Sequence, residues 1–403
     1  MRQANRQRYE PLMLFQRKKD TIYLDYAATT PMSERVRAAM EPYFSDVFAN
    51  PSSLHLPGQH AQAALDEARA TVADLLEISW KETYFTASAT ESINTILVGT
   101  VEAAKRRGVE KPHIITTAIE HSAVLQTCRA LAQWGVEVTE LPVDADGLIS
   151  AQQVRDALKP NTVLVSVMYV NNEIGTIQPI AEIADALKGT DVLLHTDAVQ
   201  AVNYLDVRPG RLGADFITLS GHKMYGPKGV GLLYKRDSIE LTPLIHGGEQ
   251  ERGLRGGTEN VAAIVGFATA LEETMGLREE EAKRVNELRD AFIWRIEGAP
   301  GISLNGSRTH RIANNVNLSI EGVDTELALP WLDAHRIAAS GGSACTARVP
   351  EPSHVIAALG KEEAARRSIR FSLGRHTNKD DVEAAAAAVI QLQNEHRQNH
   401  ADI

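Results

Sequence analysis

The chain has 403 residues with 42 Lys and Arg against 52 Asp and Glu, a formal net charge of −10. With 43% hydrophobic and 23% charged residues it has the composition of an ordinary globular protein, which excludes the disordered, collagen-like and disulfide-scaffold classes. The negative charge would repel a phosphate backbone, so nucleic acid is not expected as a principal partner.

The first twenty residues are basic and contain only a short apolar run, residues 12–15. This run is too short for the core of a signal peptide, and no later stretch approaches the roughly 18 apolar residues of a membrane span. The only cysteines are Cys128 and Cys345, which fits a reducing compartment and no disulfide framework. We therefore expect a cytoplasmic protein with a loose N-terminal extension and no membrane partner.

From about residue 60 to residue 275, helical stretches alternate with short β-branched runs. This alternation predicts a mostly parallel sheet with helices on both faces, and such sheets bind ligands at the carboxyl ends of their strands. After Gly276 a long charged helix over 277–297 leads into a weaker alternation that ends in a helix over 380–397, which predicts a second, smaller domain. The expected strands of the first region are 83–86, 113–117, 162–170, 192–196 and 215–219.

Two strand-to-helix turns carry polar residues. Residues 88–92, which include Ala89 and Thr90, follow the first strand and open a helix. They are either an ordinary helix cap or an anion site built from backbone N–H groups and a hydroxyl. His121 follows the next strand; it is either structural or, beside a flat cofactor, able to stack on it and to move protons near neutral pH.

The densest polar cluster, residues 195–200, contains Asp197 at the end of a strand, and the next strand ends in residues 220–227, which contain Lys223. A lysine in such a glycine-rich turn can donate to a phosphate or form a Schiff base with an aldehyde. Asp197 favours the Schiff base, because pyridoxal phosphate enzymes need a lysine, an anionic partner for the pyridinium nitrogen and a phosphate cup. The alternative is a surface lysine near an aspartate that caps a helix.

The two thiols and one arginine complete the candidates. Cys345 stands among glycines and small residues, where an ionised thiol would be a nucleophile, whereas Cys128 fits a small buried residue of the helical stretch 122–134. Arg370 alternates with apolar residues on an expected strand; it either pairs with an internal carboxylate or clamps a substrate carboxylate. The scattered histidines show no metal-ligand spacing, so no metal is expected.

Taken together, these segments closely resemble the class V aminotransferase superfamily, specifically the cysteine desulfurases of the IscS/NifS-like group. They run in family order from about residue 21 to residue 380. The matching segments are 23–31 (YLDYAATTP), 89–92 (ATES), 120–121 (EH), 170–175 (VNNEIG), 195–200 (HTDAVQ), 220–223 (SGHK), 256–258 (GGT), 342–345 (GSAC) and 368–375 (SIRFSLGR).

The resemblance implies an α/β protein of the pyridoxal phosphate-dependent transferase fold type I. Its mostly parallel seven-stranded sheet would be covered by helices and joined to a smaller α+β domain. The large cofactor-binding domain would span residues 34–280, and residues 1–33 with 281–403 would form the small domain that carries the catalytic cysteine. The resemblance also implies a homodimer.

The resemblance assigns roles residue by residue. Lys223 would hold pyridoxal 5'-phosphate, Asp197 would keep its ring nitrogen protonated, and His121 would stack on the ring and shuttle protons. Arg370 would bind the carboxylate of L-cysteine. The other implied cofactor contacts are Ala89, Thr90, Ser220 and His222, together with Gln200 and Asn172 at the phenolate edge or the substrate carboxylate, and Thr258 supplied by the partner subunit.

The implied reaction converts L-cysteine to L-alanine, with the sulfur kept as a persulfide on Cys345 and passed to an acceptor protein for iron–sulfur cluster or other sulfur-compound biosynthesis. The segment after Cys345 is about one residue shorter than in close relatives, which leaves the acceptor open. Alternatives on the same fold, a selenocysteine lyase, a kynureninase-like enzyme or a transaminase, would need Lys223 and Asp197 but not Cys345. A catalytically inactive homologue would show a damaged cofactor site.

Overall fold

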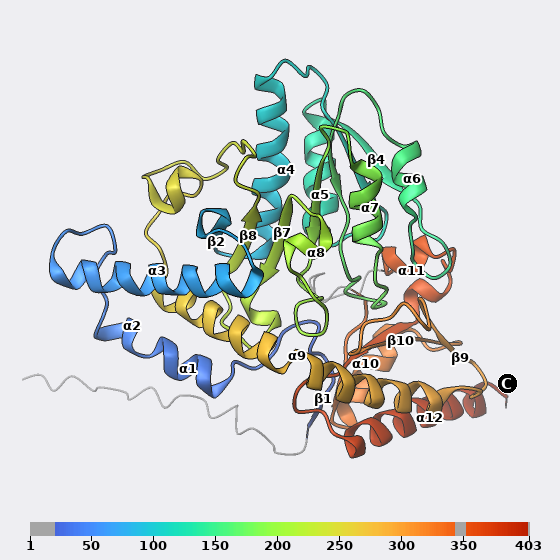
Figure 1. Ribbon diagram of the computed structural model, residues 1–403. Helices are drawn as coiled ribbons and strands as arrows, with labels where there is room; N and C mark the ends of the chain where they lie inside the picture. The colour runs from blue at the N-terminus through green and yellow to red at the C-terminus, as the bar shows by residue number, and fades with distance from the viewer. Residues whose placement is uncertain (1–20, 343–351, 402–403) are drawn as a thin grey trace, which may run out of the picture.

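A seven-stranded sheet forms the centre of the protein in the computed structural model, which describes residues 21–342 and 352–401 (Figure 1). The neighbours from β4 to β7 pair in parallel, and β8 is antiparallel to both β7 and β2. The expected mostly parallel seven-stranded sheet is therefore confirmed. In spatial order the strands are β2 (Thr83–Thr86), β8 (Gly231–Lys235), β7 (Phe216–Ser220), β6 (Leu193–Asp197), β5 (Thr162–Ser166), β3 (His113–Thr117) and β4 (Glu137–Leu141).

Helices cover both faces of this sheet. Successive residues of a strand point to opposite faces, so the apolar side chains on each face are buried only if both faces are covered. Ile114 belongs to an apolar cluster with residues of α4 (Ala89–Arg106) and α5 (Ser122–Gln133). Its neighbour Ile115 belongs to the main cluster on the other side, with residues of the helices listed next. These are α3 (Leu56–Leu76), α6 (Ala151–Asp156), α7 (Ile180–Leu187), α8 (Pro209–Leu212) and α9 (Val261–Ile296).

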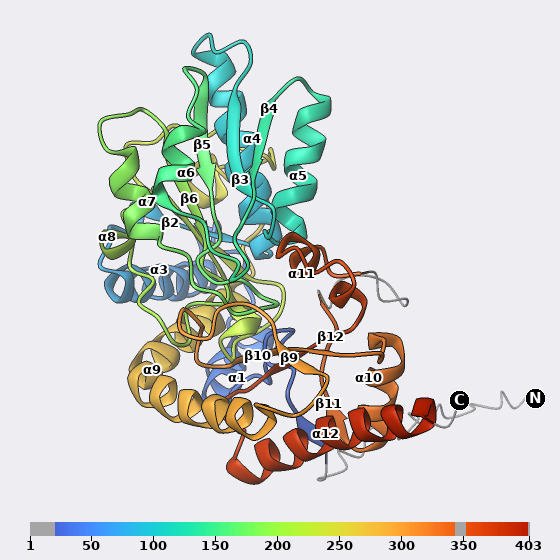
Figure 2. The ribbon, with the colours of Figure 1, turned by 90° about the vertical axis from the view of Figure 1, so that its right-hand side faces the viewer.

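A second, antiparallel sheet of three strands is formed by residues that follow α9 in the chain, and it is drawn in the lower part of Figure 2. β1 (Ile22–Tyr23) pairs in parallel with β11 (Ile337–Ala338), so the start of the described chain joins the C-terminal part. The division into domains at residues 34 and 280 stays a prediction. The other elements here are β12 (Ser368–Ser372), β10 (Asn315–Ile320), β9 (Ile302–Leu304), α10 (Thr325–Ala334), α11 (His354–Ala358) and α12 (Lys379–Ala401).

The long helix α9 differs most from the sequence expectation. The composition shift at Gly276 predicted a helix start near residue 277, but α9 already begins at Val261 and continues for 36 residues. Gly276 lies inside it with open space around its Cα, and a glycine inside a helix costs only about 1 kcal/mol relative to alanine. The shift in composition therefore marks a change in what the helix packs against. Similarly, the strand expected over 162–170 ends at Ser166.

Two short helices, α1 (Glu34–Met40) and α2 (Pro42–Ser45), connect the first strand to α3. Over residues 21–342 and 352–401, no helix is both long and apolar enough to cross a membrane.

Candidate active site

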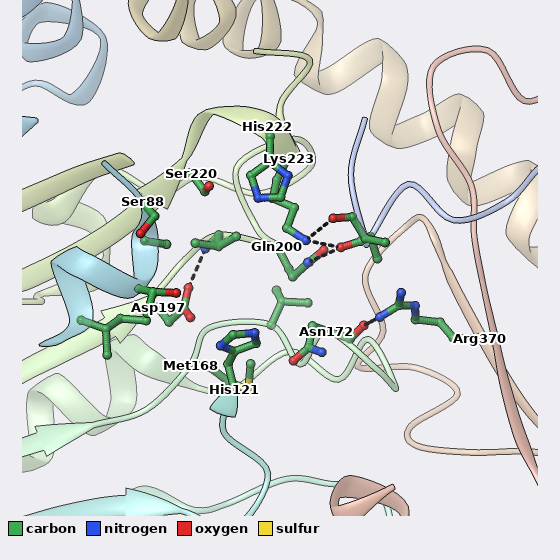
Figure 3. A pocket seen from close by; sticks show the side chains of 17 residues that line it. Ser88, His121, Met168, Asn172, Asp197, Gln200, Ser220, His222, Lys223 and Arg370 are labelled. Carbon is green, nitrogen blue, oxygen red and sulfur yellow. Dashed lines mark hydrogen bonds between the residues drawn. The ribbon is translucent and has the colours of Figure 1, made fainter. Parts of the chain in front are cut away.

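A cavity of about 170 Å³ opens at the carboxyl ends of the parallel strands. Asp197 is the last residue of β6, Ser220 the last of β7, and His121 directly precedes α5. This is the edge at which open α/β sheets place their ligands. Of the predicted site residues, those that line the cavity are Ala89, Thr90, His121, Asn172, Asp197, Gln200, Ser220, His222, Lys223 and Arg370 (Figure 3).

The amine of Lys223 is held by backbone carbonyls. Lys223 ends the short turn η2 (Gly221–Lys223), and its Nζ donates to the carbonyl oxygens of Ala27 (2.6 Å) and Ala28 (2.7 Å). The Gln200 amide also donates to the Ala27 carbonyl, at 3.0 Å. The segment 23–31, which contains both alanines, is one of the segments that match the family, but the sequence did not predict a role for it. Its two alanines place peptide oxygens, with no side chain in the way, at the wall of the cavity (Figure 3).

Asp197 is a buried carboxyl group, and burial raises its pKa, while His121, the Val199 N–H and Lys223 act in the opposite direction. The Val199 N–H donates to its Oδ1 at 3.0 Å. His121 faces the same cavity, and its Nδ1 accepts the Ala123 N–H at 3.1 Å, so the proton of the neutral ring lies on Nε2. Because burial destabilises the charged carboxylate, a cationic ring nitrogen is the partner this position favours.

Another part of the cavity lining suits an anion. The helix α4 begins there with Ala89 and Thr90, and its N-terminus presents backbone N–H groups and a positive dipole end. Burial and the nearby Lys223 lower the pKa of His222 to about 4, so its ring is neutral at pH 7. A Cβ added to Gly231 of β8 would lie 2.6 Å from the carbonyl carbon of Ser88, so this turn needs glycine beside it.

Arg370 reaches the cavity from β12 of the three-stranded sheet. Its side chain is buried; Nη2 donates to Asp25 Oδ1 at 2.8 Å and Nη1 to the Asn172 carbonyl at 2.9 Å. Its Nε has no hydrogen-bond partner among the described residues. The arginine thus pairs with an internal carboxylate, as one expectation had it, and it also lines the cavity; its role as a clamp for a substrate carboxylate stays a prediction. Asp25 was missed, because it lies 345 positions from Arg370 in the sequence.

One predicted residue that the structure describes, Thr258, does not line this cavity. Thr258 lines a second cavity of about 190 Å³ beside Glu251 and Arg255. Cys345 lies outside the described residues. The other thiol, Cys128, is buried in α5, where burial raises its pKa to about 12, so it is unsuited to act as a nucleophile. Among the described residues, no group of three or more His, Cys, Asp or Glu side chains is placed to hold a metal ion.

These groups fit pyridoxal phosphate. An amine, a buried carboxyl group, an imidazole and a helix N-terminus line one cavity, and these groups suit this cofactor. Lys223, Asp197 and His121 would hold the aldehyde, the ring nitrogen and the ring face, while Thr90, Ser220 and His222 would donate to the phosphate. The fold and the site define a pyridoxal phosphate-dependent enzyme of fold type I.

Comparisons with known proteins specify the family. The chain matches the aminotransferase class-V family over residues 22–385. The cysteine desulfurase IscS of Dictyoglomus turgidum is 44% identical over 366 residues, which is 90% of this chain and 92% of that protein. A solved NifS-like protein, 34% identical, matches with a TM-score of 0.86 over 93% of this chain and 99% of its own. A structure described as SspA in complex with cysteine, 41% identical, matches with a TM-score of 0.77 over 87% and 98%.

The chain therefore belongs to the class-V aminotransferase family, whose cofactor is pyridoxal phosphate, and its resemblance to the cysteine desulfurases is confirmed.

Proposed function

We propose that the protein is a cysteine desulfurase that converts L-cysteine to L-alanine and transfers the sulfur first to Cys345 and then to an acceptor protein. The observation that carries this proposal is Arg370, a buried arginine that lines the same cavity as Lys223. Such a group suits the carboxylate of an amino acid. The names of the relatives, cysteine desulfurase and a protein in complex with cysteine, support the substrate.

Each residue of the site has its own role in the proposed reaction. Pyridoxal phosphate, held by Lys223 and by donors at the α4 N-terminus, supplies the electron sink that lets the substrate's carbon–sulfur bond break. Arg370 and Asn172 orient the substrate, and Asp197 stabilises positive charge at the ring nitrogen. The Cys345 thiolate attacks the substrate sulfur, the carbon–sulfur pair stays with the carbon skeleton, and His121 and Lys223 supply the protons that complete alanine.

The onward step needs an acceptor. A persulfide on Cys345 gives its outer sulfur to a thiol of the acceptor protein and returns to a thiol itself. Iron–sulfur cluster biosynthesis is the proposed use, which the name IscS of the relatives supports. A reducing compartment, the cytoplasm, suits a chain with two cysteines, one of them buried and free.

Rival chemistries on the same cofactor would not need the thiol. A selenocysteine lyase or a transaminase uses the positions of Lys223 and Asp197 alone. An inactive homologue is disfavoured, because the cavity retains the amine, the buried carboxyl group and the arginine together.

The substrate assignment is tested by Arg370→Lys in an assay of alanine and sulfide formed from L-cysteine with a reductant. Lysine keeps the charge but loses the planar fork, so KM should rise about 10–100-fold, as expected for one lost charged hydrogen bond, with a smaller change in kcat. The matched control is Arg367→Lys. Arg367 lies three positions before Arg370, its side chain pairs with Asp324, and the variant should keep the parental KM. An unchanged KM in Arg370→Lys would contradict the role of Arg370.

The homodimer is the second part of the proposal. Thr258 lies away from the cavity of its own chain, which supports a contribution to the site of a second copy. The test mixes Thr258→Ala with Lys223→Ala protomers, so that a mixed dimer contains one site with both residues intact. We expect about half the parental turnover at limiting cofactor from the isolated mixed dimer. A mixed dimer no better than the Thr258→Ala homodimer would show that Thr258 acts within its own chain.

A further inference from the structure

The chain on the two sides of residues 343–351 meets at one carboxyl group, that of Glu173. The Ser353 hydroxyl donates to Glu173 Oε2 at 2.5 Å. From the other side, a Cβ added to Gly342 would lie 2.9 Å from the same oxygen and 3.2 Å from the Ser353 Cβ. Glu173 itself is buried, with 1% of its surface exposed. The described residues on the two sides of the segment that contains Cys345, Gly342 and Ser353, therefore lie against a single buried side chain.

Glu173 is a fixed point because its backbone is held from two directions. The Asn171 side-chain oxygen accepts the N–H groups of Glu173 and Ile174, each at 2.9 Å. The amides of Asn315 and Asn317, on β10 of the three-stranded sheet, donate to the Glu173 carbonyl at 2.9 and 3.1 Å. A turn with this many directed hydrogen bonds has little freedom, so its carboxyl group makes a rigid anchor.

The neighbouring chain is also fixed to the active-site elements. On the N-terminal side, Ser340 and Arg370 exchange two backbone hydrogen bonds, of 2.7 and 3.1 Å, and the Ser340 hydroxyl donates to Asp25. On the C-terminal side, His354 donates to the Glu120 carbonyl at 3.0 Å. The helix α11 packs its apolar side chains against Ile119 and Ile174, and Figure 2 shows it between α5 and the three-stranded sheet.

The anchor is close to the substrate pocket. Asn172, the residue before Glu173, lines the cavity and holds Arg370 through its carbonyl. Cys345 is three residues beyond Gly342, so covalent geometry keeps its Cα within about 11 Å of the Gly342 Cα. Moving either end away from Glu173 therefore changes the region that the thiol can reach relative to the substrate.

We propose that Glu173 is a positioning residue for sulfur transfer: next to the element that holds Arg370, its carboxyl group binds Ser353 and lies against Gly342, the described residues on either side of the segment that contains Cys345. The inference rests on the proposed role of Cys345 as the sulfur acceptor. It predicts that loosening the anchor slows the transfer of sulfur to Cys345 while cofactor binding and the response of the cofactor to cysteine are retained. A merely structural role would lower all three together.

Two variants change the contacts of Glu173, one on each side of the segment 343–351. Ser353→Ala removes the donor to Glu173, and Gly342→Ala introduces a methyl group against the carboxyl oxygen. Ser353 also caps α11, since its Oγ accepts the Ile356 N–H at 3.1 Å. Ser150 caps α6 in the same way, accepting the Gln153 N–H at 3.2 Å, so Ser150→Ala is the matched control for a lost cap. Ser353→Thr keeps the hydroxyl and is the rescue variant.

Each holoenzyme is mixed with L-cysteine and followed through one turnover. The absorption of the cofactor is recorded, and the sulfur bound to Cys345 is measured by mass spectrometry. We expect Ser353→Ala and Gly342→Ala to keep the cysteine-induced absorption change while sulfur transfer slows about 10–100-fold, as a displacement near 1 Å can cause. Ser353→Thr should recover most of the rate, and Ser150→Ala should match the parent. Parental transfer in both anchor variants, or a parallel loss of the absorption change, would overturn the proposal.

A second readout does not depend on turnover. Cys128 is buried, so iodoacetamide applied to the folded protein reports Cys345. Its alkylation rate should change several-fold in both anchor variants and not in Ser150→Ala; equal rates in all proteins would contradict the anchor. If the parent gains no sulfur on Cys345, the proposed function fails, whereas the alkylation rates still decide whether Glu173 holds the segment.

Discussion

Lys223→Ala is expected to lower the turnover of L-cysteine by at least about 10³-fold, even with excess pyridoxal phosphate, because the amine both attaches the cofactor and moves a proton at the reacting carbon. The side chain lines the cavity, and the carbonyl oxygens of Ala27 and Ala28 accept hydrogen bonds from its Nζ. The variant should lose the absorption band of the lysine-bound cofactor. The measurement is alanine formation, by chromatography, together with the absorption spectrum.

The matched control is Lys228→Ala, an exposed lysine five positions further along the same turn. It should keep the parental spectrum and rate. Turnover by Lys223→Ala at the parental rate would refute the assignment of the cofactor-binding lysine. Loss of activity in both variants would instead point to damage of the turn as a whole.

Cys345→Ser should form alanine at least about 10³-fold more slowly than the parent, since a serine hydroxyl is barely ionised at neutral pH and is a far weaker nucleophile toward sulfur than a thiolate. The variant should remain yellow and should still respond to L-cysteine, because Lys223 and the other residues that line the cavity are unchanged. This pattern separates a desulfurase from enzymes of the same fold whose chemistry does not use a thiol.

Cys128→Ala is the control for the second prediction. Cys128 is buried in the apolar cluster between α4 and α5, and its high pKa disfavours the thiolate. We expect its removal to leave turnover within about 2-fold of the parent, because Cys128 does not line the cavity. Equal activity of Cys345→Ser and the parent would contradict the role of Cys345 and would favour a transaminase or another thiol-independent reaction.

The sequence predicted the site where local pattern and position on the sheet coincide. Asp197 and Ser220 each end a buried strand, and Thr90 begins a helix after another strand. Parallel strands bring such ends to one edge, so residues far apart in the chain meet without any knowledge of the side-chain contacts. The order of strands and helices likewise predicted a mostly parallel sheet, whereas its seven strands were implied by the family resemblance.

What the sequence could not predict depends on long-range contacts. Asp25 and Glu173 stood in quoted motifs, but the partner of Asp25 is Arg370 and that of Glu173 is Ser353, 180 positions away. No local spacing contains these pairs. The start of α9 was missed because a change in composition was taken for a boundary, although the helix continues through Gly276.

The proposed function is tested most directly by a single reaction of the holoenzyme with L-cysteine in the absence of a reductant, in which alanine and protein-bound sulfur are both counted. We expect each alanine formed to be matched by one sulfur atom on Cys345, with Cys128 unmodified. Alanine formed without sulfur on Cys345, or sulfur found on Cys128, would contradict the proposed function.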